Sequence, residues 1–136
     1  MAASVARRWL DHVRRDLNTA WSASRGPRAD AGNSAYFLQQ AAEKLIKGTL
    51  VLCEIRPAKT HDLASLAEQL PHTFPMKQEL LALRDLSPYA VEFRYPDHPV
   101  TLAEPSLDEV DRWIETLEEL LERAEHLLAE HVSGGP

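Results

Sequence analysis

The sequence has little of what cross-links a chain or anchors it in a membrane. Among its 136 residues there is one cysteine, Cys53, so no disulfide can form within the chain. No apolar run approaches the roughly 20 residues needed to cross a bilayer, and the first residues meet a charge every few positions, unlike a signal peptide. These absences exclude a disulfide-stabilised secreted scaffold and favour a reducing, cytoplasmic location.

Motifs of the common enzyme classes are also missing. The chain has no glycine-rich phosphate-binding loop and no G-x-S-x-G nucleophile motif. Six histidines are present, but His126 and His131 are five residues apart and do not share a helix face. His61, His72 and His98 fall in separate expected loops, with no cysteine pair nearby. We therefore expect neither a metal ion nor a cofactor.

Charge is plentiful, and its two signs gather at opposite ends of the chain. The net charge is 15 − 21 = −6, which argues against a protein that coats nucleic acid nonspecifically. Residues 1–28 nevertheless carry six arginines against two aspartates, whereas residues 104–131 carry ten acids against two arginines. Two interpretations are open: the segments pair with each other, within the fold or across a dimer, or the basic strip contacts phosphates.

The hydrophobic pattern has the period of α-helices. It predicts helices over about 4–23, from 30 or 33 to 53, over 61–70, over 76–93 with a kink at Pro88, and from 106 onward. In the first helix, Trp9 and Trp21 fall on the broad side expected to face the core. Expected N-caps are Asp30 or Asn33 for the second helix and Thr60 for the third, where His61 and Asp62 are alternatives. Ser106 with Glu109 forms a capping-box pattern.

These elements predict an all-α fold, because no strand-like alternation or hairpin dipeptide occurs. The expected architecture is an up-and-down four-helix bundle with one additional short helix. We assign residues 1–132 to a single helical domain and 133–136 to a flexible tail.

A row of polar side chains runs along the second helix, which is otherwise apolar around most of its circumference. The row consists of Tyr36, Gln40, Glu43 and Lys47, at i, i+4, i+7 and i+11, and Lys44 flanks it. One interpretation is a solvated stripe in which Glu43 pairs with Lys47. The other is a polar groove in which Gln40 and Lys47 donate to an anion or a base edge and Glu43 orients the lysine.

The residues around this row resemble the HEPN family of small helical domains. The run Q-A-A-E-K-L-I-K at 40–47 is similar to the family's Q-A-x-E-K-x-x-K signature. T-H-D-L at 60–63 and R-Y-P-D at 94–97 are similar to two further family motifs, in the same order. The resemblance spans about 36–97, and the flanking helices agree with the family only in pattern.

The resemblance implies a helical bundle that is usually a homodimer. Family members act beside minimal nucleotidyltransferase domains, bind nucleotides, or cut RNA without a metal in toxin–antitoxin and defence systems. On this basis we predict a nucleotide-binding groove formed by the row, the T-H-D-L motif and the R-Y-P-D segment: Tyr36, Gln40, Glu43, Lys44, Lys47, His61, Asp62, Arg94, Tyr95 and Asp97.

The resemblance to the ribonuclease members is incomplete. Those members carry an arginine, a polar residue and then a histidine after about four to six positions, since arginine grips a phosphate and histidine relays a proton. Here Arg94 is followed by Tyr95, and His98 comes after three intervening residues. We therefore predict a binding module that acts with a nucleotidyltransferase. The alternatives are a metal-independent ribonuclease using Arg94 and His98, and a purely structural dimerisation bundle.

Overall fold

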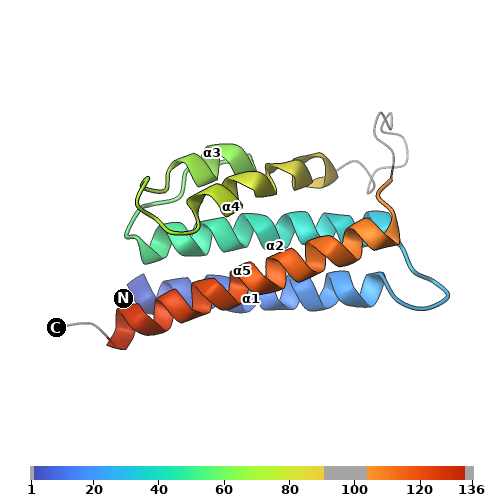
Figure 1. Cartoon of the computed structure of the whole chain (residues 1–136), viewed down its shortest axis with the longest axis horizontal. Helices are drawn as coiled ribbons and strands as arrows, with labels where there is room; N and C mark the ends of the chain where they lie inside the picture. The colour runs from blue at the N-terminus through green and yellow to red at the C-terminus, as the bar shows by residue number, and fades with distance from the viewer. Residues whose placement is uncertain (1, 91–103, 134–136) are drawn as a thin grey trace.

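The computed structural model describes residues 2–90 and 104–133, and within them every regular element is a helix (Figure 1). The long helices are α1 (Ala2–Ala23), α2 (Ala31–Leu52) and α5 (Leu107–Ser133). Three shorter elements lie between α2 and α5 in the chain: α3 (Leu63–Glu68), α4 (Lys77–Ala82) and the 3₁₀ helix η1 (Leu83–Ala90). The predicted all-α bundle is confirmed.

The α2 helix is the centre of the bundle. In Figure 1 it lies between α1 on one side and α3, α4 and η1 on the other, and α5 crosses the α1–α2 pair. Its fully buried apolar side chains include Leu38, Leu45, Ile46 and Leu50. Burying each such side chain stabilises the fold by about 1.5–3 kcal/mol. The apolar circumference of α2 is therefore explained by neighbours on several sides.

Two helix starts follow the expected capping chemistry. Asp30 caps α2, where its side chain accepts a hydrogen bond from the backbone N–H of Asn33 at 2.9 Å. At α5, the Ser106 hydroxyl accepts from the backbone N–H of Glu109 at 3.1 Å, and Glu109 accepts from the backbone N–H of Ser106 at 3.3 Å. Each bond pairs a backbone donor that the helix itself cannot satisfy.

Of the caps expected for α3, Asp62 is confirmed and Thr60 is not. Asp62 caps this helix by accepting from the backbone N–H of Ala64 at 3.1 Å. The Thr60 hydroxyl instead accepts from the backbone N–H of Asp62, also at 3.1 Å. Both side chains can cap a helix, and the path of the loop into α3 decides between them.

The predicted helix over 76–93 is divided up to residue 90, and its positions 91–93 lie outside the described residues. The α4 helix ends at Ala82, and the chain tightens into η1, which contains Pro88. Because proline lacks an N–H and clashes with the preceding turn of an α-helix, a short 3₁₀ segment accommodates it better than a kinked α-helix.

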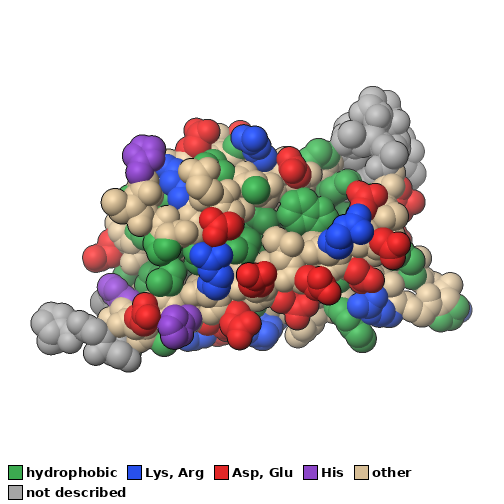
Figure 2. Space-filling model, in the orientation of Figure 1, with side chains coloured by type: hydrophobic (Ala, Val, Ile, Leu, Met, Phe, Trp, Pro, Cys, Tyr) green, Lys and Arg blue, Asp and Glu red, His purple; other side chains and the backbone are tan. Residues whose placement is uncertain are grey.

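The basic α1 and the acidic α5 pair within the fold, as one interpretation of the charge pattern predicted. Figure 2 shows acidic side chains gathered along α5. Glu125 of α5 binds Arg14 at 2.8 Å and Arg7 at 3.6 Å, and Asp111 of α5 binds Arg25 at 2.9 Å. These three arginines therefore join the first and last parts of the chain.

On its other side, α1 packs very closely against α2. A Cβ atom placed on Gly48 of α2 would lie 3.1 Å from Cβ of Trp9 and 3.1 Å from Cδ2 of Leu10. Glycine at this position allows the two helices to approach and places Trp9 at the seam between them.

Candidate functional site

Glu43 is the centre of the polar row on α2. Its carboxylate accepts hydrogen bonds from Nζ of Lys47 at 2.9 Å and from Nδ1 of His61 at 3.0 Å. The side chains of Glu43 and Lys47 are only 9% and 16% exposed, whereas that of His61 is 85% exposed. One carboxylate thus joins α2 to the loop that enters α3.

The charge of Glu43 is maintained by these two partners. Burial by itself raises the pKa of the carboxyl, but the hydrogen bonds and positive charges of Lys47 and His61 outweigh it, so the pKa lies below its ordinary value. Glu43 is therefore ionised at neutral pH and holds Lys47 in place. The predicted pairing of Glu43 with Lys47 is confirmed.

The N-terminal part of the row is paired within α2. Nε2 of Gln40 donates to Oε1 of the neighbouring Gln39 at 2.7 Å. Gln39 is fully buried, and its own Nε2 has no hydrogen-bond partner among the described residues. The Tyr36 ring packs edge-on against Phe37, with ring centroids 5.2 Å apart. Of the two predicted donors, Gln40 is bonded to its neighbour, and Lys47 is bonded to Glu43.

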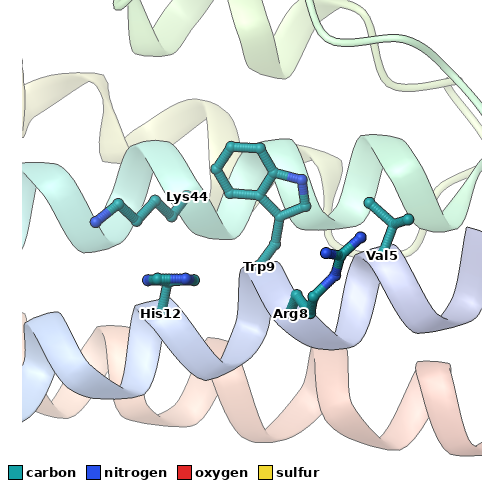
Figure 3. Close-up of a pocket in the computed structure, with 5 residues that line it drawn as sticks. All are labelled: Val5, Arg8, Trp9, His12 and Lys44. Carbon is teal, nitrogen blue, oxygen red and sulfur yellow. The ribbon is translucent and has the colours of Figure 1, made fainter.

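A hollow of about 450 Å³ lies at the seam of α1 and α2, beside the row (Figure 3). Its walls are formed by Val5, Arg8, Trp9, His12 and Lys44. The ammonium group of Lys47 lies 5.8 Å from the centroid of the Trp9 ring. The row and the hollow are therefore joined through Lys47, and Lys44 belongs to both.

The sequence pattern did not identify the α1 half of this surface. The expectation that Trp9 and Trp21 face the core was wrong: Trp9 is half-buried in the wall of the hollow, and Trp21 is 50% exposed. A usable signal was nevertheless present. Val5, Trp9 and His12 lie at i, i+4 and i+7, the spacing of Tyr36, Gln40 and Glu43 in the row.

The remaining predicted site residues are distributed as follows. His61 reaches the row through Glu43, while Asp62 is exposed and serves as the cap of α3. We also predicted that the segment after η1 contacts the row, and this stays a prediction. The predicted site residues of that segment lie outside the described residues: Arg94, Tyr95, Asp97 and His98.

The described residues give little support to three further features: a metal site, a membrane-spanning helix and a reactive cysteine. In the part of the chain that the structure describes, no three His, Cys, Asp or Glu side chains are grouped so that they could hold a metal ion. None of the described helices is both long and apolar enough to cross a membrane. Burial raises the pKa of the Cys53 thiol, which opposes formation of the thiolate that a nucleophilic cysteine requires.

Comparisons with known proteins agree with the fold and the motifs. The structure is similar to the crystal structure of TT1696 from Thermus thermophilus, with a TM-score of 0.71 and 28% sequence identity, over 90% of this chain and 97% of that one. No curated protein sequence gives a match. The sequence model of the HEPN domain matches residues 6–127, which include α2 and all three motifs. The chain therefore belongs to the HEPN domain family.

Proposed function

We propose that this HEPN domain binds a phosphate-bearing nucleotide or nucleic acid along the row of α2. The observation that carries the proposal is the arrangement at Glu43, where one buried, ionised carboxylate fixes Lys47 and His61 from two different elements. Lysine has three N–H donors, of which Glu43 takes one, and the His61 ring is largely exposed. Fixed donors with positive charge are what phosphate recognition requires.

The same arrangement favours binding over catalysis. Nζ of Lys47 donates to the Glu43 carboxylate, an arrangement that suits a ligand-positioning donor rather than a nucleophile. In this proposal the domain positions a ligand, and a nucleotidyltransferase partner supplies the chemistry, as in the family members that act in toxin–antitoxin systems. We further propose that the domain works as a homodimer in the cytoplasm.

Isothermal titration calorimetry with ATP, other nucleoside triphosphates and short RNAs tests the proposal. Replacing Lys47 with alanine should weaken binding about tenfold or more, because a hydrogen bond to a charged group is lost. The exposed Lys59, which has no ion pair among the described residues, provides the matched control, Lys59→Ala. Absence of binding by the wild-type protein, or equal binding by Lys47→Ala, would contradict the proposal.

The same samples address the segment after η1 and the ribonuclease alternative. If the R-Y-P-D segment completes the groove, Arg94→Ala should weaken binding as Lys47→Ala does. RNA that stays intact during prolonged incubation agrees with a binding module. Metal-independent cleavage that is abolished by His98→Ala would instead establish catalysis.

A further inference from the structure

The hollow at the α1–α2 seam is a second basic surface, and none of the three family motifs includes its α1 residues. Arg8 and His12 are exposed and form no ion pair with any described residue. This distinguishes Arg8 from Arg7 and Arg14 on the same helix, which are bound to Glu125. The surface therefore carries an arginine that no described carboxylate neutralises, beside a histidine ring that is open to solvent.

We propose that a single-stranded nucleic acid crosses this surface, with one base stacked on Trp9 and a phosphate on each side of it. The inference deepens the proposed function and rests on it, since it names the class of phosphate-bearing ligand. It also adds residues of α1 to a site that was predicted from α2 and the two later motifs.

Trp9 has the properties of a stacking platform. It is half-buried, its Cβ is held against α2 at Gly48, and Lys47 lies 5.8 Å from its ring centroid. The close approach of the two helices therefore fixes the base of the side chain, and the indole stands at the surface beside Lys47. Aromatic side chains of this kind stack on bases of any sequence.

The arrangement of the cations favours a strand over a mononucleotide. Figure 3 shows the Trp9 indole in the middle of the hollow, with Arg8 and Val5 on one side and His12 and Lys44 on the other. An internal nucleotide of a strand has a phosphate on both sides of its base, whereas a mononucleotide has phosphate on one side only. Hydrogen-bond donors on both flanks of the platform, Arg8 on one side and Lys44 with His12 on the other, match the strand.

The carboxylate of Asp16 lies beside this surface, where its negative charge disfavours the binding of an anion. Asp16 binds Nζ of Lys44 at 2.7 Å and neutralises part of its charge. Arg8 has no such partner among the described residues, so it should contribute most to phosphate binding. On the other side of Trp9, the exposed His12 ring can donate a hydrogen bond beside Lys44.

Fluorescence anisotropy with end-labelled single-stranded RNA and DNA oligonucleotides tests the inference. Trp9→Ala should weaken binding about tenfold or more, and Trp9→Phe should retain most of it, because phenylalanine preserves a stacking ring. Arg8→Ala should weaken binding about fivefold and make the salt dependence shallower by about 0.7, the contribution of one phosphate on a single strand.

Matched controls come from residues of α1 that do not line the hollow. Trp21 is exposed and lies under Arg25, whose guanidinium carbon is 4.8 Å from the ring centroid. Trp21→Ala removes a tryptophan without touching the hollow, and Arg14→Ala removes an arginine bound to Glu125. Both should bind the oligonucleotides as the wild type does. Circular dichroism checks that each variant is folded. If Trp9→Ala does not fold, Arg8→Ala still tests the inference, because Arg8 is exposed and its removal should not disturb the fold.

The outcomes separate this inference from the proposed function. Mononucleotides could bind as tightly as oligonucleotides, with the same dependence on Trp9. This result would overturn the proposal that the ligand is a strand, but not the proposal that the row binds phosphate. A second outcome is that Lys47→Ala weakens oligonucleotide binding, whereas Trp9→Phe, Trp9→Ala and Arg8→Ala do not. This result would overturn the proposed binding at the hollow and leave the binding along the row intact. If the wild-type protein binds neither class of ligand, both proposals fail.

Discussion

Among the described residues, Glu43 and Glu125 each bind two basic side chains, and the two glutamates differ in how exposed they are to water. Glu125 of α5 binds Arg14 and Arg7 of α1, with side chains that are 26%, 56% and 45% exposed. Glu43 of α2 binds Lys47 and His61, and its own side chain is only 9% exposed. The first cluster joins two helices at the surface, whereas the second is built into the side of the central helix.

The difference in exposure separates charged groups that only join helices from charged groups that are available to bind a ligand. Exposed ion pairs contribute little to stability, since water and salt screen them. A buried carboxylate that keeps its charge must be surrounded by fixed donors, and those donors are then organised before any ligand arrives. On α1, this contrast leaves Arg7 and Arg14 paired with α5 and Arg8 unpaired beside Trp9.

Removing the buried glutamate should have the largest effect. Glu43→Ala leaves Lys47, which is 16% exposed, without its carboxylate, and we expect a loss of about 2 kcal/mol in the free energy of unfolding. The value is below that of a fully buried pair because Lys47 retains some contact with water. Urea denaturation measures it. A loss no larger than that of Glu125→Ala would remove the distinction between the two clusters.

The lowered pKa of Glu43 predicts a pH dependence. A carboxyl whose pKa is lower in the folded state contributes stability that is complete above the ordinary range of glutamic acid, and loses it as the pH falls through the lowered folded value. Urea midpoints followed from about pH 7 down to about pH 3 should therefore fall more steeply for the wild type than for Glu43→Gln. Parallel curves for the two proteins would show that Glu43 is not responsible.

Gly48→Ala should have the next largest effect, on the side of α1 that carries Trp9. The added methyl group would lie 3.1 Å from Cβ of Trp9, which cannot move without its helix. Overpacking costs about 1–3 kcal/mol, and better helix propensity offsets up to about 1 kcal/mol, so we expect a net loss of about 1 kcal/mol. Urea denaturation measures the change. Increased stability would show that α1 and α2 are not in close contact there.

The surface cations should show the smallest effects on stability. Glu125→Ala should cost about 0.5–1 kcal/mol in the free energy of unfolding at low salt and less at high salt, because both of its arginine pairs are exposed. Arg8→Ala should change stability by less than about 0.5 kcal/mol, since Arg8 forms no ion pair with the part of the chain that the structure describes. Thermal unfolding at two salt concentrations checks both values, and a larger loss for Arg8→Ala would mean that Arg8 is structural.

Local sequence patterns predicted much of the fold because helix period and capping are local properties. The row on α2, the capping box at Ser106 and the pairing of Glu43 with Lys47 all depend on residues within a few turns of one another. The spacing of residues on one helix is enough to predict them.

What the sequence did not predict depends on contacts between distant segments. Periodicity placed Trp9 and Trp21 on the apolar side of α1. How much of that side is buried depends on where α2 and α5 pack against it, and both tryptophans lie beyond the fully buried part. The bond of His61 to Glu43 joins residues 18 apart through the course of a loop. Such contacts arise from packing, which a helical pattern does not specify.

The central claim is that the unpaired side of α1 binds phosphates and the paired side does not. Its most direct test compares the binding of one labelled single-stranded oligonucleotide to two folded variants, Arg8→Ala and Arg14→Ala, at the same salt concentration. We predict that Arg8→Ala weakens binding about fivefold while Arg14→Ala binds as the wild type does. Equal losses for the two variants, or a loss for Arg14→Ala alone, would contradict the account.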